Sequence, residues 1–197
     1  MQLHKRTLVA KATELLDSYG IADLTMRRLA RELDVTPGAL YWHFANKQQL
    51  LGAVADEILT PACAPPRHSD WPDRIAEVCA RLRNALLSHT DGAELVSASF
   101  AAGQSAAITE VLGLLAAAAA DAGLQPAQAD LAARTIMHYV LGFTVDEQSR
   151  MQWDAAGALP EEQSVLDERS DSGAAFTFGL DLLTDGLSVR GGVRPLS

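Results

Sequence analysis

Apolar residues recur every three or four positions along most of the chain, the spacing that places them on one face of an α-helix. The first such stripe runs from Leu8 to Tyr19 and predicts a helix from about Thr7 to Tyr19, which Gly20 ends. No stretch alternates apolar and polar residues with the period of a β-strand. The pattern therefore predicts an all-α protein.

The same spacing predicts the remaining helices. The expected spans are 26–33, a very short helix from residue 37, then 47–60, 71–87, 93–102, 106–122, 126–150 and 174–189. Prolines at 61, 65, 66 and 72 mark the one clear boundary between segments, and residues 157–173 are expected to form an acidic surface loop. The two last long helices are apolar around most of their circumference, which predicts that each is buried on more than one side.

The two short helices near the N-terminus are joined by a tight turn. Thr25 is suited to cap the first helix, whose arginines (Arg27, Arg28 and Arg31) lie opposite its apolar face. Thr36 is suited to cap the second, with Pro37 at the first helical position, where a missing N–H costs nothing. This arrangement predicts a helix-turn-helix that places its second helix in the major groove of DNA.

The second short helix carries three polar-tipped rings in succession: Tyr41, Trp42 and His43. A helix that only filled a core would not favour such a set. Tyr41 and Trp42 could instead wedge the helix against its neighbours, because both residue types pack as well as form polar contacts. Lys5 and Arg6, at the start of the first helix, could reach a DNA phosphate or remain solvated.

The segment from Val35 to Phe44, followed by Asn46 and Lys47, resembles the DNA-binding signature of the tetracycline-repressor (TetR) family. The resemblance implies operator DNA as a partner. The expected DNA-binding residues are Arg27, Arg28, Thr36, Pro37, Gly38, Ala39, Tyr41, Trp42, His43 and Lys47. Arg27 is expected at a base or phosphate, whereas Arg28 could equally be solvated. Gly38 and Ala39 are expected at the groove floor, and the hydroxyls, the imidazole and Lys47 at phosphates.

Charge is divided unevenly along the chain. The net charge is −9, but residues 1–55 hold seven basic against five acidic side chains, and the remainder holds nine against twenty. Basic residues thus gather where phosphates would be met. Apolar residues make up 48% of the chain without a run long enough to span a bilayer, and the basic N-terminus is not followed by an apolar signal-peptide core. We expect a cytoplasmic protein without a membrane partner, in which Cys63 and Cys79 remain reduced.

The resemblance extends to later parts of the chain: Ala85–Ala93, His138–Gly142 with Asp146–Gln148, and Phe178–Leu180 with Gly186 and Leu187. It implies a helix-turn-helix domain over residues 1–46, a connecting helix over 47–62, and a helical ligand-binding and dimerisation domain over 63–197. In this family an inducer shifts the connecting helix and spreads two recognition helices apart. The apolar last helices predict a homodimer with a four-helix interface and hence a palindromic operator.

The expected inducer contacts are Leu82, Val96, Ser99, Leu112, His138 and Asp146. Tetracycline repressors hold their drug as a magnesium chelate, but the chain has Val78, Val96 and Leu112 where that family has an asparagine, a metal-binding histidine and a glutamine. A single remaining carboxylate holds Mg²⁺ poorly. We therefore expect a more apolar pocket for a polycyclic or antibiotic-like molecule, with no protein metal site and no cofactor. His138 could equally be a satisfied core histidine.

An enzyme is not expected. Ser88, His89 and Asp91 supply the residue types of a catalytic triad, but they are adjacent in a turn and cannot form its geometry. No phosphate-binding glycine loop or nucleophile elbow is present in the sequence. The sequence predicts a ligand-responsive repressor, controlling an efflux or resistance gene by analogy with the family. The alternative is a constitutive repressor without an inducer.

Overall fold

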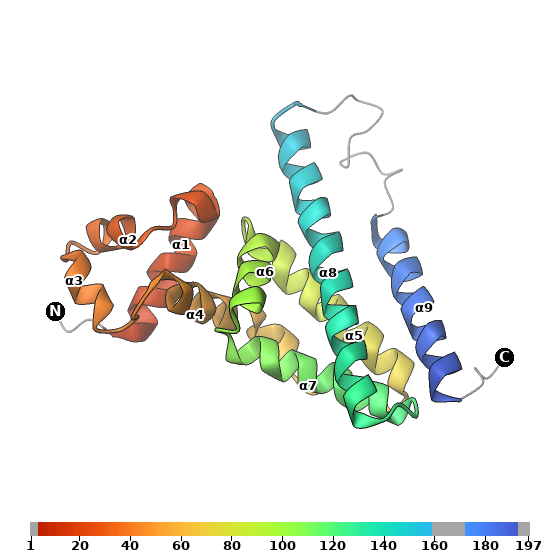
Figure 1. Ribbon diagram of the computed structural model, residues 1–197. Helices are drawn as coiled ribbons and strands as arrows, with labels where there is room; N and C mark the ends of the chain where they lie inside the picture. Colours follow the sequence, from red (N-terminus) through yellow and green to blue (C-terminus); the bar gives the residue numbers. More distant parts are fainter. Residues whose placement is uncertain (1–3, 159–171, 193–197) are drawn as a thin grey trace. The chain divides into compact units, whose positions relative to one another are not determined.

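A computed structural model describes residues 4–158 and 172–192, and within these ranges all regular structure is helical. The predicted all-α class is confirmed. The helices, in chain order, are α1 (Lys5–Asp23), α2 (Met26–Glu32), α3 (Pro37–Tyr41), α4 (Lys47–Leu59), the 3-10 helix η1 (Thr60–Cys63), α5 (Trp71–Leu87), α6 (Gly92–Ala102), α7 (Ala106–Asp121), α8 (Pro126–Ala155) and α9 (Ser172–Gly191) (Figure 1).

The chain divides into two compact units, and each contains segments that are distant in sequence. The first unit comprises Met1–Pro61 and Asn84–Thr109, so it holds α1 to α4 together with α6. The second unit comprises Ala62–Arg83 and Glu110–Ser197, and it holds most of α5 and α7 with all of α8 and α9. The functional division at residues 46 and 62 stays a prediction.

Local capping explains why the short helices begin where they do. The Thr25 hydroxyl accepts a hydrogen bond from the Arg28 N–H at 3.1 Å, and the side-chain oxygen Oδ1 of Asn46 accepts one from the Gln49 N–H at 2.9 Å. The cap at Thr25 confirms the prediction. The prediction that the Thr36 side chain caps α3 is wrong, since its hydroxyl makes no capping hydrogen bond. Pro37 at the start of α3 supplies the fixed φ angle that begins this helix instead.

Helix α1 is longer than predicted because it resumes after Gly20. Gly20 has φ 76° and ψ 175°, which interrupts the helix at the residue expected to end it. The following Ile21 N–H donates to the Asp91 carboxylate at 2.9 Å, so a side chain from 70 residues away satisfies the backbone group that the interruption exposes. A Cβ at Gly20 would lie 2.6 Å from Asp91 Oδ2, so both φ and space require glycine here.

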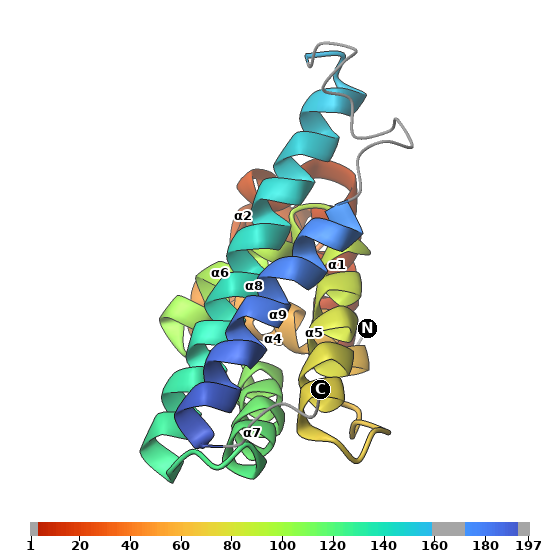
Figure 2. The same cartoon turned by 90° about the vertical axis from the view of Figure 1, so that its right-hand side faces the viewer.

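Helices α8 and α9 form the long pair of the second unit. They run side by side in opposite directions in both views (Figures 1 and 2). The residues of α8 that pack inward include Ile136, Met137 and Val140, all buried. Helix α8 continues to Ala155, beyond the predicted end near Arg150, and most of the predicted 157–173 loop lies outside the described residues. Within the described ranges no single helix is long and apolar enough to cross a bilayer; only the bent pair α6 and α7 passes such a test, by length and composition.

Candidate functional site

The turn between α2 and α3 sets the direction of the recognition helix. Asp34 adopts φ 53°, a left-handed conformation that its short polar side chain tolerates better than most residues. The next residue, Val35, donates its N–H to the Ala30 carbonyl oxygen at 2.9 Å, which closes the turn. The tight turn predicted between the two helices therefore contains one left-handed residue, Asp34, which redirects the chain into α3.

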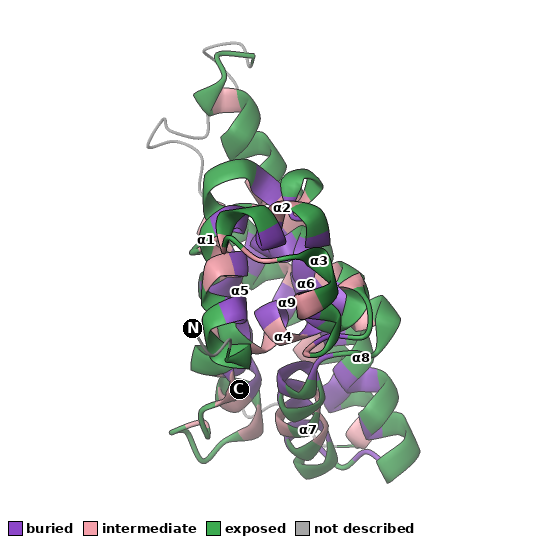
Figure 3. Ribbon diagram, turned by 90° about the vertical axis from the view of Figure 1, so that its left-hand side faces the viewer, coloured by how far each residue is buried: buried purple, intermediate pink, exposed green. Residues whose placement is uncertain are grey.

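The recognition helix α3 has one buried face and one exposed face. Leu40 and Phe44 are buried and anchor the helix in the first unit, whereas Tyr41 is 52% exposed and Trp42 is 91% exposed. Figure 3 shows α3 as mostly exposed. The alternative in which Tyr41 and Trp42 wedge the helix against its neighbours does not fit these exposures. Two adjacent exposed aromatic rings are instead available to a partner.

Gly38 in α3 has no internal reason to be glycine. Its φ lies outside the left-handed region, and a Cβ there would meet only the Thr36 hydroxyl, at an ordinary 3.8 Å. A glycine inside a helix costs about 1 kcal/mol relative to alanine. Thr36 and Pro37 beside it are exposed and Ala39 is half-buried. The packing of the described residues therefore does not account for a glycine at this position.

The two candidate arginines of α2 differ in their surroundings. The Arg28 guanidinium donates to Asp23 at 2.9 Å and lies 3.8 Å from the centre of the Tyr19 ring. These contacts hold Arg28 against α1, in a structural role that the sequence did not indicate. Arg27 is exposed and forms no ion pair within the described part of the chain. His43 and Lys47 are half-buried beyond the end of α3.

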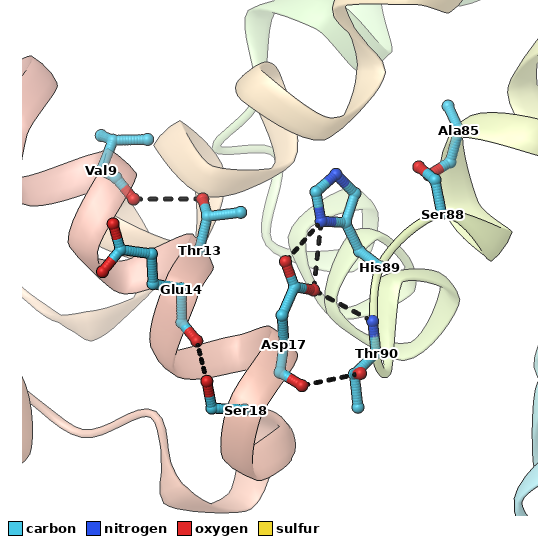
Figure 4. Close-up of polar contacts among 9 residues, drawn as sticks. All are labelled: Val9, Thr13, Glu14, Asp17, Ser18, Ala85, Ser88, His89 and Thr90. Atoms are coloured by element: carbon cyan, nitrogen blue, oxygen red, sulfur yellow. Dashed lines mark hydrogen bonds and ion pairs between the residues drawn. The ribbon is translucent and has the colours of Figure 1, made fainter.

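The turn before α6, which contains the residue types of a catalytic triad, attaches α6 to α1. Asp17 of α1 accepts hydrogen bonds from the Thr90 N–H at 3.1 Å and lies 3.1 Å from His89 Nδ1 (Figure 4). The Ser88 hydroxyl points away from this pair and donates to the Ala85 carbonyl oxygen at 2.7 Å. The turn therefore fastens α6 to α1, and Ser88 does not contact His89 as a nucleophile would.

Helix α4 is hydrogen-bonded to Asn84–Thr109, the later segment of the first unit. The Asp56 carboxylate accepts hydrogen bonds from the Ser105 hydroxyl at 2.7 Å and from the Ala107 N–H at 2.9 Å. One turn earlier on α4, Gly52 packs so closely that a Cβ would lie 2.2 Å from the Gln104 carbonyl oxygen. The connecting helix that follows the recognition helix is thus held directly by the turn between α6 and α7.

The candidate inducer contacts do not share one kind of environment. Leu82 in the second unit and Val96 in the first each have no exposed surface, and Ser99 is 2% exposed with a hydroxyl that has no hydrogen-bond partner. Leu112 is half-buried, whereas His138 and Asp146 are exposed on α8. His138 is therefore not a buried core histidine. No cluster of three or more potential metal ligands occurs among the described residues.

One charged pair in the second unit was missed by the sequence reasoning. The Arg83 guanidinium donates twice to the Glu147 carboxylate, with Nε at 2.8 Å, and it also contacts the Ser172 hydroxyl at 3.2 Å. Both partners belong to the same chain, although 64 residues separate them in the sequence. Burial by itself raises the pKa of Glu147, but the hydrogen bonds from Arg83 and Ser172 outweigh it and leave the pKa below its usual value.

Aromatic rings surround this charged pair. Arg83 lies 5.0 Å from the Phe176 ring centre, which is 5.3 Å from the ring centre of Phe143. The Tyr139 hydroxyl donates to the Phe176 carbonyl oxygen at 2.7 Å. Positions 139, 143 and 147 recur every four residues along α8, so this spacing was a sequence signal that one face of the helix had a single environment. No comparable spacing in the sequence indicates that Arg83 and Phe176, which are distant along the chain, contact this face of α8.

The α8–α9 pair exposes apolar side chains on its outer surface. Leu131, Phe178, Leu182 and Val189 are 66%, 66%, 58% and 80% exposed. A groove of about 340 Å³ lies between the two helices, and its walls include Leu124, Leu131, Ile136, Leu183, Leu187 and Arg190. An apolar surface of this kind is typical of a protein–protein interface.

Comparison with known proteins agrees with this geometry. Solved structures similar to the chain include BioQ of Mycobacterium smegmatis, at 63% identity and TM-score 0.89 over 96% of this chain and 100% of that one. A structure of BioQ with its natural double-stranded DNA operator is 60% identical, with TM-score 0.82 over 95% and 99% of the two chains. TetR-Q116A of Acinetobacter baumannii AYE in complex with minocycline is 33% identical, with TM-score 0.73 over 95% and 98%.

Family models cover nearly all of the chain. The model for bacterial regulatory proteins of the tetR family matches residues 8–54, and the model for the tetracycline repressor-like C-terminal domain matches residues 64–190. Proteins of this family are transcriptional regulators and not enzymes, in agreement with the sequence prediction. The predicted resemblance is therefore confirmed, and the chain belongs to the TetR family of transcriptional regulators.

Proposed function

We propose that the protein is a transcriptional repressor that binds a palindromic operator as a homodimer and leaves it when a small-molecule inducer binds. The observation that carries the proposal is the exposed surface of the recognition helix. Tyr41 and Trp42 are exposed there, and the packing within the protein does not require a glycine at position 38. The similarity to BioQ, whose structure with operator DNA is known, supports the same function. A repressor that meets chromosomal DNA works in the cytoplasm.

The DNA contacts follow from the exposures on α2 and α3. Arg27 contacts a base or phosphate, and Gly38 and Ala39 allow close approach to the groove floor, where Ala39 touches a thymine methyl. Thr36, Tyr41, His43 and Lys47 bind phosphates and fix the register of the helix. The unused Thr36 hydroxyl is available for this purpose because it caps nothing. Arg28 supports the surface through Tyr19 and Asp23.

The homodimer is part of the proposal because the outer surface of α8 and α9 is apolar. A second copy that covers Leu131, Phe178, Leu182 and Val189 would remove four large exposed side chains from water. Two-fold symmetry then duplicates α3. Half-sites roughly 34–36 Å apart, or a little more, would fit the two recognition helices.

The inducer acts by shifting a population. The dimer samples a spacing of recognition helices that fits the operator and a wider one, and the inducer must bind the wider form more tightly. The minocycline complex of a relative supports ligand binding through this fold. We propose a polycyclic or antibiotic-like inducer, without magnesium, and control of an efflux or resistance gene.

A constitutive repressor is the second candidate, and one observation favours it. Leu82 and Val96 occupy expected inducer positions but have no exposed surface, so each is packed against protein atoms on all sides. Exposed His138 and Asp146 lie outside any such packed environment. A repressor with this core would bind its operator in the presence of every candidate inducer.

A mobility-shift experiment with DNA flanking the gene tests the proposal. The wild-type protein is expected to bind this DNA, and Tyr41→Ala is expected to lose binding while remaining a folded dimer, because the Tyr41 ring is outside the core. Trp153→Ala is the matched control, since Trp153 is an aromatic residue that is 61% exposed but lies on α8 in the second unit. Unchanged binding by Tyr41→Ala, or a monomeric or unfolded product, would refute the assignment of Tyr41.

Titration of the complex with polycyclic aromatic compounds, including minocycline, with and without Mg²⁺, separates the two candidates. Release that does not depend on magnesium supports an apolar inducer pocket. Release only by minocycline with magnesium would show that the expected loss of chelation is wrong. Binding that no compound disturbs favours the constitutive repressor.

A further inference from the structure

The basic residues of the first unit fall into two groups according to their partners. Lys11 is paired with Glu14 at 2.9 Å, and Arg28 is paired with Asp23 at 2.9 Å. Among the residues that the structure describes, Lys5, Arg6, Arg27, Arg31 and Lys47 form no ion pair. Arg27 and Lys47 are already expected at the DNA. Lys5, Arg6 and Arg31 remain without an assigned partner.

The fold holds Lys5 beside the end of the recognition helix. Its ammonium lies 5.2 Å from the centre of the Phe44 ring. Phe44 is 1% exposed, and its N–H donates to the carbonyl oxygen of Leu40, in α3, at 3.0 Å. The beginning of α1 thus lies next to the end of α3, as Figure 1 shows. Lys5 reaches this place although it is 32 residues before α3 begins.

The contact with Phe44 positions the charge of Lys5 without cancelling it. A cation over an aromatic face is stabilised by about 0.5–1 kcal/mol at an exposed site, and it keeps its full charge and its three N–H donors. An acidic partner would have neutralised that charge, as Glu14 does for Lys11. An exposed, oriented and unpaired ammonium loses less conformational entropy when it binds an anion.

The geometry points to Lys5 as a DNA-backbone contact: its ammonium binds a phosphate beside the end of the recognition helix and fixes the position of α3 on the duplex. This inference rests on the operator binding proposed above. The contact is independent of base sequence, because a phosphate carries no sequence information. It extends the phosphate-binding surface from α3 and Lys47 to the start of α1.

The salt dependence of DNA binding tests this role. Each phosphate contact contributes about 0.9 to the slope of log affinity against log salt concentration. A dimer contains two copies of Lys5, so wild type should lose DNA affinity more steeply with salt than Lys5→Gln does. The ratio of the wild-type DNA affinity to that of Lys5→Gln is expected to fall by about twelvefold between 50 and 200 mM salt. The ratio is expected to be the same on the operator and on unrelated duplex DNA.

Two further variants separate a local contact from a general charge effect. Lys11→Gln removes the same charge from the same helix, but its ammonium is already paired with Glu14, so its salt slope is expected to stay close to that of wild type. Lys5→Arg is expected to restore the slope. An unchanged slope for Lys5→Gln, or an equal loss for Lys11→Gln, would overturn the role of Lys5 while leaving operator binding intact. A wild-type protein that binds no DNA would overturn both proposals.

Discussion

The contact between Gly52 of α4 and the turn before α7 leads to a prediction about stability. In Gly52→Ala the new methyl group would lie 2.2 Å from the Gln104 carbonyl oxygen and 2.8 Å from its carbonyl carbon. Both are backbone atoms, so a change of rotamer cannot relieve the overlap. Asp56, one turn later on the same face, would move away from Ser105 and Ala107, which it holds at 2.7 and 2.9 Å.

Two opposing effects determine the size of the change. Overpacking of a tight contact costs about 1–3 kcal/mol, and a backbone overlap lies in the upper part of this range. Alanine is better than glycine inside a helix by about 1 kcal/mol, which offsets part of this cost. We expect the free energy of unfolding to fall by about 1–2 kcal/mol. For a chain of this size that corresponds to a decrease in Tm of roughly 2–8 °C.

Thermal and urea unfolding followed by circular dichroism would measure the change. Protomer concentration must be kept constant, because dimer formation makes the apparent stability depend on it. Gly113→Ala is the matched control, since Gly113 lies inside α7 and a Cβ there meets nothing within 4 Å. This control is expected to gain up to about 1 kcal/mol from helix propensity alone. If Gly52→Ala is as stable as wild type, or more stable, the packing argument is wrong.

Two further predictions concern ionisable groups in the second unit. The lowered pKa of Glu147 means that its pair with Arg83 stabilises the fold fully above about pH 4.5, and that this contribution is lost as pH falls through the lower, folded-state value. The difference in unfolding free energy between wild type and Glu147→Gln, measured in urea, should therefore shrink below pH 4.5; a constant difference would contradict it. Burial raises the pKa of the Cys79 thiol, so a thiol reagent should modify Cys79 only after the protein unfolds. Any modification of the native protein should therefore occur at Cys63 and should be lost in Cys63→Ser. Rapid modification of native Cys63→Ser would exclude a buried Cys79.

The sequence was sufficient wherever a few neighbouring residues determine the structure. Thr25 and Asn46 cap their helices through hydrogen bonds that span three residues, and Pro37 begins α3. Such local signals are visible in the sequence itself. The exposures of Tyr41 and Trp42 also fit the expected recognition surface.

Features that depend on contacts with another segment of the chain could not be predicted. Gly20 was expected to end α1, but Asp91 accepts from the Ile21 N–H and the helix continues. Arg28 was expected at the DNA or in solvent, and nothing in its own helix indicated that Tyr19 and Asp23 of α1 would hold it. Hydrophobic periodicity identifies which residues face inward, but not which helix they face.

The prolines from Pro61 to Pro72 correctly indicated a boundary between the two units, but they did not indicate that the chain returns to the first unit. The first unit does end its N-terminal segment at Pro61, yet it also includes Asn84–Thr109 from beyond the boundary. Composition changes along a chain reveal where one segment stops. They cannot reveal that a later segment returns to pack with an earlier one.

The attachment of α6 to α1 and α4 has a consequence for the construction of chimeric repressors. A graft that transplanted only residues 1–61 into another regulator would separate Asp17 from Thr90, Ile21 from Asp91, and Asp56 from Ser105. The unit that can be exchanged as a module is discontinuous, and it includes Asn84–Thr109. Operator specificity should therefore transfer between relatives only when these two pieces are inherited together.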